Sequence, residues 1–319
     1  MPDEASFFRD FETMKPSPVV ASLSKLIRLN SVVHLAVFTK QDIARYYDLT
    51  ETHYRRIWNL GSARSLHYGY WDDTTPDFYA ALININRVLA DTLSINSRHH
   101  VLDAGCGVGG SSIWLAADRK CRVTGITLNA RQVELANQNA RDAGVQELTG
   151  FYQRDYLASG FGDQSFDVVW AIESVCYAND KADFLREAFR LLKPGGAVIV
   201  ADFFKKDKLD SSSSRAVQRM ANGWAINDFC TSEYFLHSMR LIGFTAIKDE
   251  DITQRIMPSA KRLYRSYFPG VVAASIYRLL HPGATALGRN NVQTAAAQYR
   301  TLKRGLWSYR IVSGRKPAH

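Results

Sequence analysis

The feature that most constrains the fold is the regular alternation of short apolar runs with amphipathic segments between residues 100 and 205. The apolar runs predict strands over residues 100–104, 122–127, 151–154, 166–171 and 197–202. The segments between them predict helices over residues 111–117, 130–143 and 181–192. Strands and helices that alternate in this way form a parallel sheet with helices on both faces. The sequence therefore predicts an α/β fold.

The segments on either side of this alternation are mostly helical. Before it, a helix is predicted within residues 43–60 and an amphipathic helix over 76–96. After it, Ser211 to Ser214 predicts a loop, followed by a helix over 231–243, a strand over 245–252, helices within 253–304 and a strand over 307–314. We therefore divide the chain into a helical N-terminal cap (1–75), a core (76–252), a helical lid or substrate cap (253–304) and a last core strand with a tail (305–319).

The composition predicts a globular protein, and the sequence also indicates its cellular compartment. Of 319 residues, 46% are hydrophobic and 22% are charged, and no apolar run reaches the roughly 18 residues that a membrane span needs. The N-terminus lacks the basic and apolar pattern of a signal peptide, so a cytoplasmic protein is expected. The cysteines Cys106, Cys121, Cys176 and Cys230 lie far apart, which predicts reduced thiols and no metal site.

The formal net charge of +9 admits several interpretations. A soluble basic enzyme is the plainest, and the others are an anionic substrate, a membrane surface or nucleic acid. The arginines are spread along the chain and no lysine-rich tail is present, which argues against nucleic acid. The oligomeric state stays open, and a homo-oligomer is one option.

A glycine-rich loop follows the first strand and opens a helix. It reads Asp103-Ala-Gly105-Cys106-Gly107-Val-Gly-Gly, and its glycines allow tight turns and a close approach of a ligand to the backbone. Such a loop alone is weak evidence, because enzymes that bind nicotinamide dinucleotides use a similar one. Asp103 discriminates between the two ligands, since a carboxylate would attract the ammonium and sulfonium of S-adenosylmethionine and repel a pyrophosphate.

Three segments resemble the motifs of class I S-adenosylmethionine-dependent methyltransferases. Residues 101–110 resemble the first motif, residues 166–173 the fourth-strand motif, and residues 191–196 the turn before the fifth strand. They occur in the family's order and cover about residues 98–205. The resemblance implies S-adenosylmethionine as cofactor and a Rossmann-like sheet of seven strands, of which the last is antiparallel.

The same resemblance assigns the expected cofactor contacts residue by residue. Many family members place an acidic residue after the second strand for the ribose hydroxyls, but this chain has Thr127 and Asn129 there. Asp155 follows the third strand, where the family uses an acidic residue against the adenine amine. The expected cofactor-binding residues are Tyr46, Asp103, Gly105, Cys106, Gly107, Thr127, Leu128, Asn129, Gln132, Asp155, Tyr156 and Ile172.

Further segments resemble a narrower group of enzymes. The segment Tyr46-Tyr47-Asp48 resembles the start of sterol methyltransferases and cyclopropane-fatty-acid synthases. Residues 67–72 and 171–174 resemble segments of sterol and tocopherol methyltransferases. Bacterial isoprenyl diphosphate C-methyltransferases belong to the same group. The resemblance implies methylation of an alkene carbon of an isoprenoid through a carbocation, which is then deprotonated or cyclised. The expected catalytic residues are Glu173, Tyr47, His67 and Tyr177.

The positive charge suggests a substrate within that group. A prenyl diphosphate such as geranyl or farnesyl diphosphate has an apolar tail for an aromatic cavity and an anionic head for arginines, with Mg²⁺ as a candidate assistant. We expect Trp71, Trp224, Phe229 and Phe268 beside the tail. Arg262 and Arg265 are the expected contacts to the head group. No protein ligands for a resident metal are expected.

Other functions remain open at this point. A nucleic-acid methyltransferase is disfavoured because residues 171–174 contain no proline, unlike the motif typical of base methylation at an exocyclic amine. A small-molecule N- or O-methyltransferase could use His67 or Glu173 as its base. A protein that binds the cofactor without catalysis is the third possibility.

Overall fold

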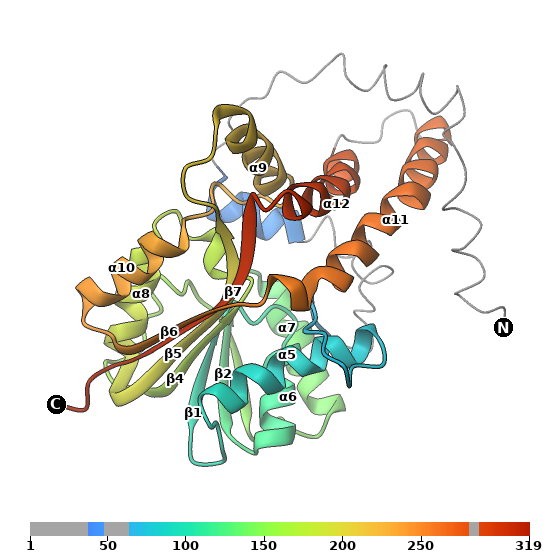
Figure 1. The fold of residues 1–319 in the computed structure, drawn as a ribbon. Coiled ribbons are helices and arrows are strands. Elements are labelled where there is room, and N and C mark those ends of the chain that lie inside the picture. The colour runs from blue at the N-terminus through green and yellow to red at the C-terminus, as the bar shows by residue number, and fades with distance from the viewer. Residues whose placement is uncertain (1–37, 48–63, 281–286) are drawn as a thin grey trace. The chain divides into compact units, whose positions relative to one another are not determined.

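Seven strands form one sheet in the computed structural model. The structure describes residues 38–47, 64–280 and 287–319, and the side chains of residues 268–292 are not described. The strands are β1 (His100–Ala104), β2 (Arg122–Thr127), β3 (Thr149–Gln153), β4 (Phe166–Ile172), β5 (Leu192–Lys205), β6 (Thr245–Asp251) and β7 (Trp307–Arg315). Their order is β3-β2-β1-β4-β5-β7-β6, and β7 is antiparallel to both of its neighbours (Figure 1). The predicted Rossmann-like sheet, with its last strand antiparallel, is therefore confirmed.

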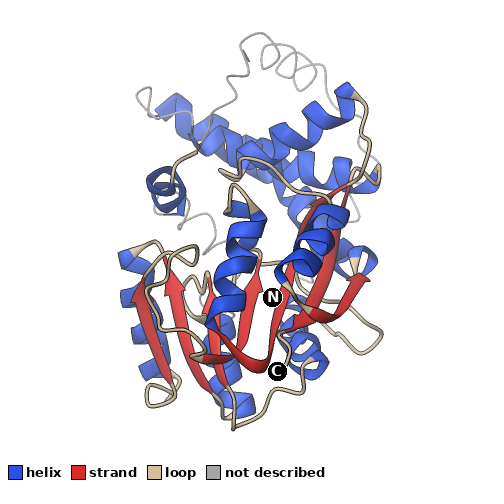
Figure 2. Ribbon diagram, turned by 90° about the vertical axis from the view of Figure 1, so that its left-hand side faces the viewer, coloured by secondary structure: helices blue, strands red, loops and turns tan. Residues whose placement is uncertain are grey.

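Helices cover both faces of the sheet (Figure 2). They are α5 (Phe78–Thr92), α6 (Gly110–Arg119), α7 (Ala130–Asp142), α8 (Lys181–Leu191), α9 (Ser211–Gly223), α10 (Ser232–Ile242), α11 (Thr253–Leu280) and α12 (Leu287–Lys303), with a 3₁₀ turn η1 (Val175–Tyr177). Residues 40–47 form a further helix, and residues 48–60 of the predicted 43–60 helix lie outside the described residues. The described residues belong to one compact unit, residues 38–319.

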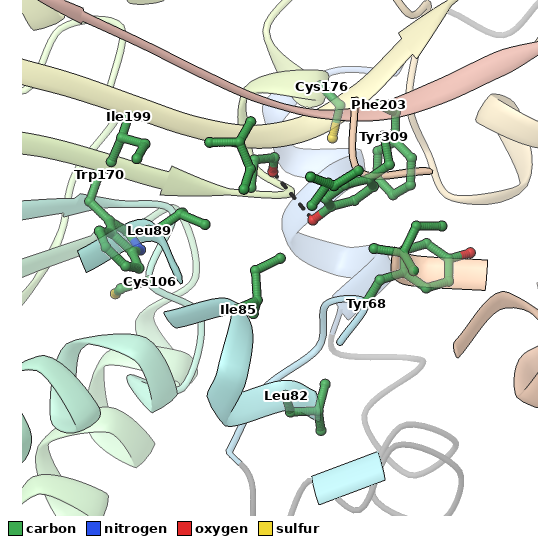
Figure 3. Packing of buried hydrophobic residues seen from close by; sticks show 14 of the residues in the cluster. Tyr68, Leu82, Ile85, Leu89, Cys106, Trp170, Cys176, Ile199, Phe203 and Tyr309 are labelled. Atoms are coloured by element: carbon green, nitrogen blue, oxygen red, sulfur yellow. Dashed lines mark hydrogen bonds between the residues drawn. The ribbon is translucent and has the colours of Figure 1, made fainter. Parts of the chain in front are cut away.

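Alternate residues of the central strands enter two separate hydrophobic cores. Val168 and Trp170 of β4 pack in the core beneath α5, α6, α9, α11 and α12. Val169 and Ala171 pack in the core beneath α8 and α10. Side chains in a strand point alternately to opposite faces, so a strand buried on both faces must be apolar along its whole length. Figure 3 shows Trp170 and Ile199 meeting Leu89 of α5 in the first core.

The prediction of a loop at Ser211 to Ser214 is wrong, because these serines open helix α9. The Asp210 side chain accepts hydrogen bonds from the backbone N–H groups of Ser212 and Ser213 at 2.8 and 3.0 Å. An N-cap of this kind lets serines, which have only moderate helix propensity, begin a helix. The α9 residue Met220 then contacts Thr301 of α12 at 3.2 Å. The helices above the sheet thus include α9, which lies within the predicted core segment.

The topology places a ligand site at one point of the sheet. The chain order reverses between β1 and β4, which are adjacent and parallel. In open α/β sheets, ligands bind outside the carboxyl ends of the strands at such a reversal. The glycine loop follows β1 and Glu173 follows β4, so both lie at this position.

Candidate active site

A cavity opens at the carboxyl ends of β1, β2 and β4. Its empty volume is about 910 Å³, which includes the solvent space at its opening. Many of the residues that we predicted for the site lie on its wall. They are Tyr47, His67, Asp103, Gly105, Cys106, Gly107, Thr127, Leu128, Asn129, Gln132, Tyr156, Ile172, Glu173 and Tyr177. The tertiary structure thus brings together residues from six separate stretches of the chain.

Asp103 is a buried carboxylate at the end of β1. It accepts a hydrogen bond of 2.5 Å from Ser112 Oγ, which lies in the first turns of α6. Burial raises the pKa of Asp103 to about 6, and the Ser112 hydrogen bond partly opposes that rise. A buried carboxylate that is hydrogen-bonded to Ser112 is further stabilised by a nearby positive charge. The site therefore suits the ammonium of the expected cofactor.

Changing Asp103 to Asn should weaken cofactor binding by roughly 10- to 100-fold, because it removes the negative charge while keeping the shape. In the unchanged protein, affinity should fall as the pH drops through about 6, since the carboxylate then becomes protonated. Calorimetric titration with S-adenosylhomocysteine across this range would measure both effects. The exposed Asp73→Asn is the matched control. If Asp103→Asn bound S-adenosylhomocysteine as tightly as the unchanged protein, the charge of Asp103 would not contribute to cofactor binding.

The glycine loop has the geometry of a ligand cradle. The backbone N–H groups of Gly105 and Cys106 donate to Ile126 O at 2.9 and 3.0 Å, which fixes the loop against the end of β2. Ser174 Oγ donates to Ala104 O at 2.6 Å and joins the loop to the end of β4. The N-cap of α6 is Gly109, which has no side chain to satisfy the first N–H groups of that helix. The loop, Asp103 and the cavity together fit S-adenosylmethionine.

The segment after β2 presents amides in place of the usual acidic residue. Thr127 Oγ1 donates to Gln132 Oε1 at 2.7 Å, so the amide nitrogen of Gln132 is the atom that can donate to a ligand hydroxyl. The Asn129 side chain caps α7 by accepting from Gln132 N at 3.1 Å. The expectation that Gln132 and the backbone near Leu128 serve the ribose stays a prediction, and both residues line the cavity.

The helix over residues 40–47 covers the cavity beside α7. Asn129 Nδ2 donates to Ala44 O at 3.2 Å, and Ala44 lines the cavity. Lys40 forms an ion pair with Asp155, whose other oxygen accepts from Leu157 N at 2.9 Å. Asp155 is not among the residues that line the described cavity, and its expected contact with the adenine amine stays a prediction. Tyr46, also expected at the cofactor, is buried with its ring against Tyr47.

Glu173 is held by two donors that come from distant parts of the chain. Its Oε1 accepts from Tyr68 N at 2.6 Å and from the Tyr309 hydroxyl at 2.9 Å. The rings of Tyr68, Tyr309 and Phe203 pack edge to face around this point, with centroids 5.3–5.9 Å apart (Figure 3). With Oε1 occupied in this way, Oε2 is the oxygen left for chemistry in the cavity.

Glu173 has a strained backbone conformation, and burial destabilises its charged form. Its φ of +48° lies in the left-handed region, which a residue with a Cβ adopts at a cost of about 1 kcal/mol. Burial raises the pKa of Glu173 to about 8, and the negative charge of Asp202 adds to the rise. Asp202 itself is buried and accepts from Cys176 N and Phe203 N at 2.9 and 2.8 Å. A carboxylate with a raised pKa is a stronger base than an exposed one.

Three tyrosines line the cavity and are held by hydrogen bonds. Tyr47 donates to the Tyr177 hydroxyl at 3.0 Å, and Tyr177 donates to Trp224 O at 3.1 Å. The Tyr156 hydroxyl donates to Ser174 O at 2.8 Å. These bonds fix the ring positions, so the aromatic faces are set before a ligand binds.

His67 is a buried histidine with one unsatisfied ring nitrogen. Its Nδ1 lies 3.0 Å from Tyr68 O, and a carbonyl oxygen can only accept, so Nδ1 carries the proton. Nε2 is then an acceptor, and it has no partner among the described residues. Burial lowers the pKa of His67 to about 4, so the ring is neutral at physiological pH.

The residues expected to contact the substrate do not gather at the described cavity. Trp71 donates to Ser259 Oγ at 2.8 Å, and Trp224 and Phe229 pack on Phe203 with centroids 5.4 Å away. Arg262 and Arg265 are exposed on α11, and Arg262 lies over the Phe78 ring at 4.9 Å. The Phe268 side chain lies outside the description.

Sequence reasoning missed several residues that shape the site. The sequence pattern assigns no role to Tyr68, Tyr309 or Ser112. Tyr309 is 136 positions from its partner Glu173, and no motif in the sequence links the two. Only the pairing of β5 with β7 brings Tyr309 beside the end of β4. Among the described residues, no group of three or more His, Cys, Asp or Glu could hold a metal ion.

Comparison with known proteins supports this interpretation of the site. The family described as "Methyltransferase domain" matches residues 102–200. The 27-O-demethylrifamycin SV methyltransferase of Amycolatopsis mediterranei is 32% identical over 224 residues, which are 69% of this chain and 80% of that protein. The sterol 24-C-methyltransferase of Gibberella zeae is 30% identical over 218 residues, which are 66% of this chain and 57% of that protein.

A solved structure shows the same fold at low identity. Geranyl diphosphate C-methyltransferase from Streptomyces coelicolor, in complex with Mg²⁺, geranyl diphosphate and S-adenosyl-L-homocysteine, superposes with a TM-score of 0.68. It is 19% identical, and the match covers 88% of this chain and 99% of that one. The sequence relatives, the matched family and the glycine loop agree. This chain belongs to the class I S-adenosylmethionine-dependent methyltransferases.

Proposed function

We propose that this enzyme transfers a methyl group to an alkene carbon of an isoprenoid. The observation that carries the proposal is the Glu173 carboxyl, fixed by Tyr68 N and the Tyr309 hydroxyl at the cavity that the glycine loop also lines. The relatives include a sterol C-methyltransferase, which supports this class of chemistry. The chain spans little more than half of that relative's length, so the substrate remains a proposal.

The arrangement suits a reaction in which positive charge develops on the substrate. The bound cofactor supplies an electrophilic methyl group. An alkene that takes this methyl would become a tertiary carbocation, while the sulfur–methyl bond breaks and a neutral thioether leaves. The carbocation must be shielded from water and must then lose a proton. The rings of Tyr47 and Tyr177 offer faces that stabilise a nearby cation by up to about 2 kcal/mol each when desolvated. Glu173, with its pKa raised to about 8, then accepts the proton.

The described cavity gives little support to the expected diphosphate head group. Among the described residues of the cavity wall, Arg64 is the only lysine or arginine. A diphosphate carries several negative charges and binds best to a cluster of cations or to Mg²⁺. Arg262 and Arg265 lie away from that wall, and residues 48–63, which include Arg55 and Arg56, are outside the description. The described wall therefore favours a neutral isoprenoid over a prenyl diphosphate.

O-methylation is a second candidate, and His67 favours it. Its buried Nε2 is an acceptor without a described partner, and a substrate hydroxyl would supply the missing donor. The same nitrogen could then remove the hydroxyl proton during transfer. The rifamycin relative, by its name, methylates oxygen.

A panel assay with labelled cofactor distinguishes these possibilities. The matched pairs are geraniol with geranyl diphosphate and farnesol with farnesyl diphosphate, together with a sterol, a prenylated quinol and an amine. We expect a product with a new carbon–methyl bond, and turnover of the neutral member of each pair at least equal to that of the diphosphate. Mass spectrometry of the product locates the methyl group.

The outcomes separate the two candidates. A methyl ether formed from an alcohol or quinol would replace the proposal with O-methylation. In that case His67→Gln should lose most turnover while a His99→Gln control on the opposite end of β1 keeps it. Strong preference for the diphosphate of each pair would restore the head-group expectation.

A further inference from the structure

The helical insertion carries the whole excess of positive charge in this chain. Residues 253–304 contain nine Lys and Arg residues and no Asp or Glu. The full chain has 40 basic and 31 acidic residues, so basic and acidic residues are equal in number outside the insertion. A segment of this length without any acid differs sharply from the mixed charges of an ordinary solvated surface.

The basic residues of α11 whose side chains are described lie on one exposed face of the helix. The exposed positions between 254 and 265 recur at helical spacing, and they are Gln254, Arg255, Pro258, Lys261, Arg262 and Arg265. The positions between them face inward and are buried, namely Ile256, Ser259, Ala260 and Leu263. Residues spaced three or four apart share a face of a helix, so the cations form one stripe.

Helix α12 extends this stripe. Arg300 is exposed and lies over the Tyr264 ring of α11 at 5.8 Å, and Tyr264 stacks on Tyr299 with centroids 4.9 Å apart. The two helices run side by side over the carboxyl ends of the strands (Figure 1). We call the surface formed by Arg255, Lys261, Arg262, Arg265 and Arg300 the basic face.

Two side chains connect Glu173 to the buried side of α11, which is opposite the basic face. Tyr68 donates its backbone N–H to Glu173 and its hydroxyl to Gln298 Oε1 at 2.6 Å. Gln298 Nε2 in turn donates to Ala260 O at 2.9 Å, on the buried side of α11. The basic face is thus the outer side of a helix whose inner side is joined to Glu173 through Gln298 and Tyr68.

We infer that the basic face docks this enzyme on an anionic lipid surface, from which it draws its substrate. Each Lys or Arg near such a surface contributes about 1 kcal/mol of attraction, so five cations on one face bind strongly. Among the described residues, no helix is long and apolar enough to cross a bilayer.

The choice of lipid over nucleic acid rests on the proposed isoprenoid substrate. An isoprenoid partitions strongly into a bilayer because its apolar surface leaves water there. Nucleic acid would meet the same charges but has no alkene to offer the cavity. The inference goes beyond the proposed reaction, since it concerns where the substrate is collected.

Vesicle flotation with the full chain tests the docking. The vesicles contain phosphatidylcholine with about 30% phosphatidylglycerol, or phosphatidylcholine alone. The triple variant Arg255→Gln, Lys261→Gln, Arg300→Gln should bind the anionic vesicles roughly 10- to 100-fold more weakly than the unchanged chain. The unchanged chain should bind neutral vesicles weakly and should lose its anionic binding as salt is raised.

A second triple variant removes the same charge elsewhere. Arg98→Gln, Arg122→Gln and Lys248→Gln alter exposed residues at the other end of β1 and β2 and on the edge strand β6. This control should keep vesicle binding within about threefold. Equal losses in the two variants, or equal binding to neutral vesicles, would overturn the inference. So would a DNA duplex that binds the unchanged chain more tightly than the anionic vesicles do.

The readout is separate from turnover. A chain that binds anionic vesicles through the basic face but methylates no alkene contradicts the proposed reaction alone. A chain that methylates an isoprenoid alkene without binding the vesicles contradicts the docking alone.

Discussion

Glu173→Gln is expected to lower kcat by roughly 10²- to 10⁴-fold while cofactor affinity changes by less than about threefold. The amide keeps the hydrogen bonds from Tyr68 N and the Tyr309 hydroxyl but can no longer accept a proton. It also removes the negative charge that would stabilise a cation in the cavity. Single-turnover assays with labelled cofactor measure the first effect, and calorimetry with S-adenosylhomocysteine measures the second.

A matched glutamate separates this role from a general effect of charge. Glu147→Gln removes one charge from an exposed residue beyond α7 and should leave kcat unchanged. If Glu173→Gln retained near-full activity on the substrate found in the panel assay, Glu173 would not be the base. Loss of cofactor binding in this variant would instead place the carboxyl in the cofactor site.

The pH profile gives a signature that a merely structural role would not produce. The base must be ionised, so kcat/KM should rise with pH through the pKa of Glu173, near 8 in the unliganded protein. The Tyr309 hydroxyl donates to the carboxylate and lowers that pKa. Tyr309→Phe should therefore move the rising limb to higher pH. The absence of any shift would show that Tyr309 does not position or tune the carboxyl.

Gly105→Ala is expected to weaken cofactor binding by roughly 100-fold or more. Its φ of +93° disfavours any residue with a Cβ, and an added Cβ would lie 2.3 Å from the Cβ of Ser174. Ser174 cannot retreat freely, because its hydroxyl donates to Ala104 O. The loop must move, and with it the cradle that Asp103 and the α6 terminus form. Calorimetry with S-adenosylhomocysteine measures the loss.

Gly144→Ala provides the control for backbone strain. Gly144 also has a positive φ, of +68°, but an added Cβ would meet no heavy atom within 4 Å. This variant should lose about 1 kcal/mol of stability and keep its cofactor affinity. A thermal melt of both variants checks that they are folded. Equal cofactor affinity in the two folded variants would contradict the importance of the close approach to Ser174.

The sequence was most informative where the determinants are local. The bounds of β1 and β2 match the predicted strands residue for residue, because short apolar runs between turn signals have few alternatives. The glycine loop is also local, since the φ values of its glycines and the carboxylate of Asp103 sit within a few residues. The cofactor class could therefore be predicted from one stretch of chain.

One prediction was wrong because the local sequence pattern is compatible with more than one structure. A serine run predicts a loop on propensity alone, but the Asp210 cap and packing against α12 make it the start of α9. The expected contact of the cations around Arg262 with a head group stays a prediction. The same periodicity that groups the cations also turns them outward, because the buried side of α11 is filled by Ile256 and Leu263.

By itself, the sequence determined the Rossmann-like sheet, the cofactor and the position of Glu173 at the end of a strand. Only the tertiary structure decided what holds that carboxyl, because Tyr68 and Tyr309 reach it from 105 and 136 residues away. It also decided which charges face the cavity and which face outward. Turns and strands follow from interactions between near neighbours in the chain, whereas the electrostatic environment of a side chain depends on every element that packs around it.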